Sequence, residues 1–160
     1  MDLRSAPGFL GSDASFLADL TLVVFILLAI LMVIGFIFAR RKMFVPYHKF
    51  TMTAILIIIW IFVAFNMWVT YSSFAGDVPS HLGEPMFLLP TIHLIIGGIA
   101  QILGTILVLR MWLEKVLPKA LRFEPIKPYM RLTLTLWIIN IVLGIGIYVM
   151  FYGAPFSKHG

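Results

Sequence analysis

Four long apolar stretches constrain this chain more than any other feature. They cover residues 16–38, 51–71, 87–109 and 132–152. At about 1.5 Å of rise per residue, an α-helix of each length crosses a hydrocarbon core of about 30 Å. Unpaired backbone groups are costly in lipid and no stretch alternates as a membrane barrel strand does, so each is expected to be helical. The sequence therefore predicts an all-α fold, an integral membrane four-helix bundle.

The composition excludes most other classes of protein. The chain has 160 residues, of which 61% are hydrophobic and 12% charged, whereas soluble domains are roughly half apolar and about a quarter charged. The spans and their connections fill the chain, so we expect one transmembrane domain over residues 1–160 and no nucleic-acid partner. Cysteine is absent, which excludes disulfides, Cys-based zinc sites and thiol catalysis. No sequence motif of a hydrolase, a phosphate-binding loop or a zinc protease is present, and we predict that the chain is not an enzyme.

The distribution of charge predicts how the bundle lies in the membrane. All basic residues except Arg4 and Lys158 fall in the two connections at residues 39–50 and 110–131. Most acidic residues fall on the opposite side, namely Asp2, Asp13, Asp19, Asp77 and Glu84. By the positive-inside rule, both basic connections face the cytoplasm, and the N- and C-termini lie on the outer side.

Two helix faces carry the polar residues expected at membrane depth. At 100° per residue, one face of the third stretch holds small and polar residues, and so does one face of the fourth. The two sets are Pro90, His93, Gly97, Ala100, Gln101 and Gly104, and Thr133, Trp137, Asn140, Gly144 and Tyr148. These faces should look at each other or at the bundle centre, because small residues allow close backbone approach. The amides of Asn66, Gln101 and Asn140 either form interhelical hydrogen bonds or line a quinone or proton path.

His93 is the most informative single residue, because an imidazole two turns below the outer boundary needs a partner or a metal. Asp19 enters from the same side, and a hydrogen bond between the two would orient the ring and leave its second nitrogen free. Three interpretations stay open: plain hydrogen-bonded structure, axial ligation of haem or copper, and proton handling. Met86 lies two turns before His93 on the same face and would suit copper(I). About 10 Å along the axis separates the two residues, so one ion needs a break at Pro90.

His48 begins the second stretch on the basic side, so His48 and His93 lie toward opposite faces of the membrane. One haem iron needs its axial nitrogens about 4 Å apart, given metal–nitrogen bonds near 2 Å. The two histidines therefore cannot ligate the same iron. His48 is either an interfacial, hydrogen-bonded residue or a cofactor ligand of its own.

From about Arg40 to Gly153, several short motifs follow one another in an order that resembles a known family. They are Arg40-Arg41-Lys42, His48-Lys49, Met52-Thr53-Ala54, His93-Leu94 with Gly97, Gly104 and Thr105, and Arg131-Leu132-Thr133-Leu134-Thr135-Leu136-Trp137 with Gly144, Tyr148 and Tyr152. The family consists of small bacterial four-helix membrane proteins of unassigned activity, some of which are accessory factors for maturation of haem-copper cytochrome oxidases. The resemblance implies a multi-pass protein of the bacterial inner membrane with family histidines at His48 and His93. The family also tends to carry a histidine before the fourth helix, where this chain has Tyr129-Met130-Arg131.

Three functional hypotheses follow. The first, implied by the resemblance, is a non-catalytic accessory or assembly protein of a respiratory haem-copper oxidase, which would handle haem or copper through His93 with Asp19 or Met86. The second is a structural subunit packed against other integral membrane subunits of a larger redox or photosynthetic complex. The third is a small quinone- or proton-handling module built on Gln101, Asn140 and His93.

Overall fold

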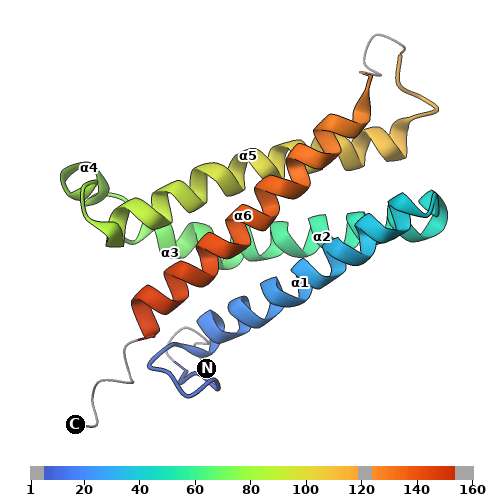
Figure 1. Ribbon diagram of the computed structural model, residues 1–160. Coiled ribbons are helices and arrows are strands. Elements are labelled where there is room, and N and C mark those ends of the chain that lie inside the picture. Colours follow the sequence, from blue (N-terminus) through green and yellow to red (C-terminus); the bar gives the residue numbers. More distant parts are fainter. Residues whose placement is uncertain (1–5, 119–123, 154–160) are drawn as a thin grey trace.

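The chain folds as four long apolar helices packed in a bundle (Figure 1), as the all-α prediction requires. The computed structural model describes residues 6–118 and 124–153. The long helices are α1 (Phe16–Arg40), α2 (Lys49–Phe62), α5 (Pro85–Leu113) and α6 (Ile126–Tyr152). Part of the predicted connection 110–131, residues 119–123, lies outside the described residues, as do Asp2, Arg4 and Lys158.

The second span is a composite of four elements. It runs through η1 (Phe44–His48), α2, η2 (Val63–Met67) and α3 (Trp68–Ser72). Val45 is extended in η1, the conformation favoured for a residue that precedes a proline, and η2 is a single π-helical turn. The short helix α4 (Val78–His81) follows. By length and composition, four segments of the described part of the chain could cross a membrane: Phe16–Arg40, Phe44–Ser72, Pro85–Leu113 and Ile126–Tyr152.

Two helices extend further into the basic connection than the apolar stretches suggested. α5 continues to Leu113 and α6 begins at Ile126, where the sequence had placed a connection over residues 110–131. Pro128 does not stop α6, because it lies in the first turn, where its missing N–H would have no intrahelical partner in any case. An apolar run locates the lipid-facing part of a helix and not its polar continuation toward the headgroups.

The four helices form a ring in which sequence neighbours pack side by side. α1 contacts α2 and α6, α2 contacts α5, and the most extensive contact joins α5 to α6. Figure 1 shows α1 and α5 running one way and α2 and α6 the other. The end that holds residues 41–43 and 114–118 is called the basic end below, and the end that holds α4 is called the α4 end. Which end faces the cytoplasm stays a prediction.

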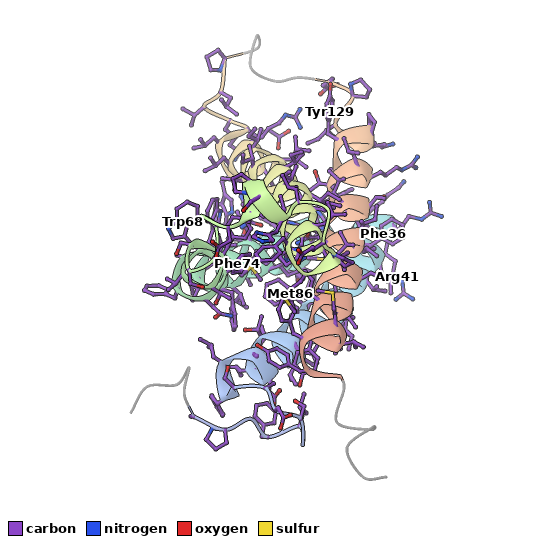
Figure 2. All side chains as sticks on the ribbon, turned by 90° about the vertical axis from the view of Figure 1, so that its left-hand side faces the viewer. Phe36, Arg41, Trp68, Phe74, Met86 and Tyr129 are labelled. Atoms are coloured by element: carbon purple, nitrogen blue, oxygen red, sulfur yellow. The ribbon has the colours of Figure 1, made fainter. Side chains whose placement is uncertain are left out.

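The core is small and the outer surface is apolar. Among the residues that the structure describes, nine make up the buried cluster: Leu28, Met32, Ile55, Leu56, Ile59, Ala100, Val108, Trp137 and Ile141. Large apolar side chains also cover the outside of all four spans, and Figure 2 shows Phe36 and Trp68 pointing outward on opposite sides of the molecule. Such a surface suits contact with a lipid bilayer.

Candidate functional site

The α5–α6 interface holds His93 and Asn140, and glycines let its two backbones approach. A Cβ atom at Gly97 would lie 2.6 Å from Asn140 Nδ2, and one at Gly104 would lie 2.5 Å from the Trp137 ring. One at Gly144 would lie 3.2 Å from His93 Cε1. The prediction that the two polar faces look at each other is therefore confirmed.

His93 lies inside this interface and bonds to Asn140. Its Nε2 is 3.5 Å from Asn140 Nδ2, a long hydrogen bond in which the amide donates. Its Nδ1 is enclosed and has no hydrogen-bond partner among the residues described. With Gly144 against the ring edge, a planar macrocycle could reach a nitrogen of His93 only if α5 and α6 moved apart.

Asp19 does not bond to His93, so that predicted hydrogen bond is wrong. Its carboxylate accepts from the Tyr148 hydroxyl at 2.5 Å and from the backbone N–H groups of Phe9 at 2.6 Å and Leu10 at 2.7 Å. The residue is fully buried, with 0% exposure. Three hydrogen bonds, two of them from successive backbone amides, give a buried carboxylate the donors it needs.

Asp19 and His93 do not meet because they lie at different depths along the bundle axis. Asp19 lies in the first turn of α1, and Tyr148 lies one turn from the end of α6, at the same α4 end. His93 lies about two turns into α5, level with Gly144 and not with Tyr148. The signal was present in the sequence, since Tyr148 belongs to the polar face of the fourth stretch and is the member nearest the outer boundary.

The segment before α1 folds back and covers Asp19. Phe16 N–H donates to Ala6 O and Gly8 N–H to Ala14 O, both at 2.9 Å, which closes residues 6–16 into a loop. Gly8 is required by close approach, because a Cβ there would lie 2.5 Å from Asp19 Oδ2. Ser12 Oγ lies 2.8 Å from the Tyr148 hydroxyl. A loop that sequence reasoning left without a role thus completes the site of the buried carboxylate.

The three amides in the spans all bond between helices, which is the first of the two interpretations that the sequence left open for them. Asn66 donates to Thr21 Oγ1 at 2.8 Å, Gln101 donates to the Leu56 carbonyl at 3.3 Å, and Asn140 bonds to His93. Cofactor binding by Gln101 and Asn140 stays a prediction. Several enclosed polar atoms of α5 and α6 nevertheless have no hydrogen-bond partner among the residues described: His93 Nδ1, Gln101 Oε1, Asn140 Oδ1 and Trp137 Nε1.

His48 is the last residue of η1 and packs against α1 at the basic end. Its Nδ1 is 2.9 Å from the Gly35 carbonyl, its ring meets the Phe44 ring edge-on, and its side chain is 6% exposed. Lys49 lies over the Trp112 ring at the same level. The rise of α5 from His93 to Trp112 is about 28 Å, so the two histidines are far too distant to share an iron.

The other candidate metal ligand, Met86, lies apart from His93. α5 is continuous through Pro90, so nothing shortens the separation of about 10 Å along the axis. Met86 is half exposed in the first turn of α5. Within residues 6–118 and 124–153, no three His, Asp or Glu side chains gather in a group that could hold a metal ion.

Comparisons of the chain with protein-family models, with curated proteins and with solved structures gave no match. They therefore identify no family for this chain. The part of the family resemblance that the structure supports is a four-helix protein with four candidate membrane spans.

Proposed function

We propose that this chain is a non-catalytic accessory protein of the bacterial inner membrane that assists assembly of a respiratory haem-copper oxidase complex. One observation carries the proposal: the residues of the family resemblance are those that hold the helices together. His93 meets Gly144, Trp137 meets Gly104, and Tyr148 binds Asp19. A likeness confined to lipid-facing residues would reflect apolar composition alone. A likeness in the residues that fix helix register supports a common fold.

Two further contacts extend the same pattern to α2. Trp112 Nε1 donates to Thr53 Oγ1 at 2.9 Å, and Trp60 Nε1 donates to Thr105 Oγ1 at 3.1 Å. Thr53 and Thr105 both belong to the motifs that carry the resemblance. The motifs therefore account for contacts of α2 with α5, of α5 with α6 and of α6 with α1.

Deletion of the gene in the source organism tests the proposal. The expected result is a several-fold loss of assembled oxidase, measured as its reduced-minus-oxidised haem spectrum in membranes, with oxidase subunit transcripts unchanged. The wild-type gene should restore the spectrum. A normal amount of active oxidase in the deletion strain would contradict the proposal.

Copurification separates an assembly factor from a structural subunit. An assembly factor should accompany oxidase precursors and leave the mature enzyme. If the chain stays in stoichiometric amount with mature oxidase or with a photosynthetic complex, the structural-subunit hypothesis replaces the assembly role.

A quinone- or proton-handling module is the second candidate, and the enclosed polar atoms of α5 and α6 that have no partner among the described residues favour it. His93 Nδ1 supplies a nitrogen, and Gln101 Oε1 and Asn140 Oδ1 supply acceptors. Quinone retained by the purified protein and lost in Gln101→Leu would support this candidate. Equal quinone content in the variant and the wild type would exclude Gln101 from such a site.

A further inference from the structure

Asp19 holds the loop before α1 in one conformation. The backbone N–H groups of Phe9 and Leu10 both donate to Asp19 Oδ2, at 2.6 and 2.7 Å. Successive backbone N–H groups that share one anionic oxygen form a concave turn, and the anion stabilises its shape. Gly11 follows with a φ of 77°, in the left-handed region that glycine adopts without strain. The backbone of this loop is therefore tied to a buried group in α1.

The two side chains at this turn point away from the bundle. Phe9 is 51% exposed and Leu10 is 47% exposed, although both side chains are large and apolar. A loop without such restraints could turn these side chains inward and remove their apolar surface from water. The hydrogen bonds to Asp19 instead stabilise a backbone conformation in which the apolar pair stays outside.

The apolar pair lies next to the start of a membrane span. α1 begins at Phe16 and is the most apolar of the four candidate spans. The Phe9 ring lies beside the Phe16 ring, with centroids 5.5 Å apart, and Figure 1 shows the loop folded back at the start of α1. Phe9 therefore extends the apolar surface of α1 beyond the end of the helix. Asp13 on the same loop is exposed, so polar and apolar groups meet at this level, as they do where lipid headgroups meet acyl chains.

A lipid surface fits this pair better than a protein partner does. A specific protein interface buries about 800 Å² on each partner, of which two half-exposed side chains provide only a small part. The pair is continuous with the apolar outside of α1, which suits contact with a bilayer. Phe and Leu are also among the side chains with which interfacial segments enter the boundary between headgroups and acyl chains.

We propose that the loop over residues 6–16 is an interfacial membrane anchor, in which the side chains of Phe9 and Leu10 enter a phospholipid surface at the α4 end. Asp19 is the positioning residue, because it binds the backbone of both. The anchor goes beyond the proposed accessory role and does not depend on it. It gives the buried carboxylate a second purpose, besides joining α1 to α6 through Tyr148.

Spin labelling tests the proposal, because the chain has no cysteine of its own. Phe9→Cys, Leu10→Cys and the matched control Asp13→Cys each receive a nitroxide label in the full-length protein, which is reconstituted into vesicles of phosphatidylcholine and phosphatidylglycerol. Electron paramagnetic resonance then compares collisions of the label with oxygen, which dissolves in lipid, and with a water-soluble nickel chelate. The first two labels should reach about 5–10 Å into the boundary between headgroups and acyl chains, and the control label should stay in water.

Two second-site variants separate the anchor from the packing of the helices. Asp19→Ala removes the acceptor of both loop bonds, so the label at Leu10→Cys should lose its depth. Tyr148→Phe removes the bond between α1 and α6 and leaves both loop bonds to Asp19 in place, so the same label should keep its depth. A label at Ile30→Cys, on the exposed outside of α1, should report unchanged lipid contact in both variants if the bundle stays inserted.

Three results would count against the anchor. Collisions with nickel at the first two labels equal to those at the control label would overturn the proposal. Protection of these two labels from nickel and oxygen alike would also overturn it, because protein, such as a second copy of the chain, would then cover the pair. Depth that survives Asp19→Ala would overturn the positioning role of Asp19.

Discussion

Removing the Tyr148 hydroxyl should loosen the α4 end of the bundle. This hydroxyl donates to Asp19 Oδ1 at 2.5 Å and lies 2.8 Å from Ser12 Oγ. In Tyr148→Phe, the carboxylate of Asp19 keeps only the two backbone donors from Phe9 and Leu10. The variant tests whether a hydrogen-bonded carboxylate, and not apolar packing alone, joins α1 to α6 at this end.

The expected magnitude follows from the burial of Asp19. A hydrogen bond to a charged group contributes about 1.5–3 kcal/mol in water-soluble proteins, whereas interhelical bonds in a membrane protein average about 0.6 and reach about 1.7 kcal/mol. Asp19 is fully buried and accepts three hydrogen bonds, so the upper part of the membrane range applies. With a smaller neutral contribution from Ser12, we expect Tyr148→Phe to lower the free energy of unfolding by about 2 kcal/mol.

Unfolding in mixed micelles by titration with sodium dodecyl sulfate, followed by far-UV circular dichroism, measures this change. Tyr152→Phe is the matched control, because the Tyr152 ring lies beside that of Tyr148, with centroids 5.3 Å apart, and its hydroxyl bonds to none of the described residues. A double-mutant cycle with Asp19→Ala should give a coupling of at least about 1 kcal/mol. Coupling below about 0.3 kcal/mol, or equal effects of the two tyrosine variants, would refute the reasoning.

Three further predictions concern the helix interface and the orientation of the chain. Gly97→Ala should destabilise the bundle by about 1–3 kcal/mol, because the new Cβ would meet the Asn140 amide at 2.6 Å. Gly98→Ala places its Cβ in open space and should stabilise the bundle by up to about 1 kcal/mol through helix propensity. The same detergent titration compares the two variants. Trp137→Phe should lower the free energy of unfolding by roughly 1–2 kcal/mol, because the smaller ring leaves a cavity against Gly104 in the buried cluster. Removal of the enclosed indole N–H, which has no partner among the described residues, offsets part of this cost. An unchanged stability would show that the interface closes around the smaller ring. The variant Arg41→Cys should react with a membrane-impermeant maleimide only after the cells are opened, whereas Asp77→Cys should react in intact cells. Labelling of both variants from the same side of the membrane would contradict the predicted orientation.

The sequence predicted the parts of this molecule that depend on helical periodicity. A helix repeats every 3.6 residues, so the positions of His93, Gly97 and Gly104 on one face follow from their spacing alone. The facing residues Trp137 and Asn140 follow in the same way, and the contacts between the two sets are present in the structure. Lipid strengthens such reasoning, because it restricts the backbone of a span to the helix.

Periodicity does not give the relative depth of residues on different helices. The pairing of Asp19 with Tyr148 and of His93 with Asn140 depends on where each helix begins, and the true ends differ from the apolar runs by several residues. The loop over residues 6–16 was also beyond the pattern, because its closure depends on backbone hydrogen bonds and on the missing side chain of Gly8. Both features are set by three-dimensional packing, which the spacing of residues along one helix does not determine.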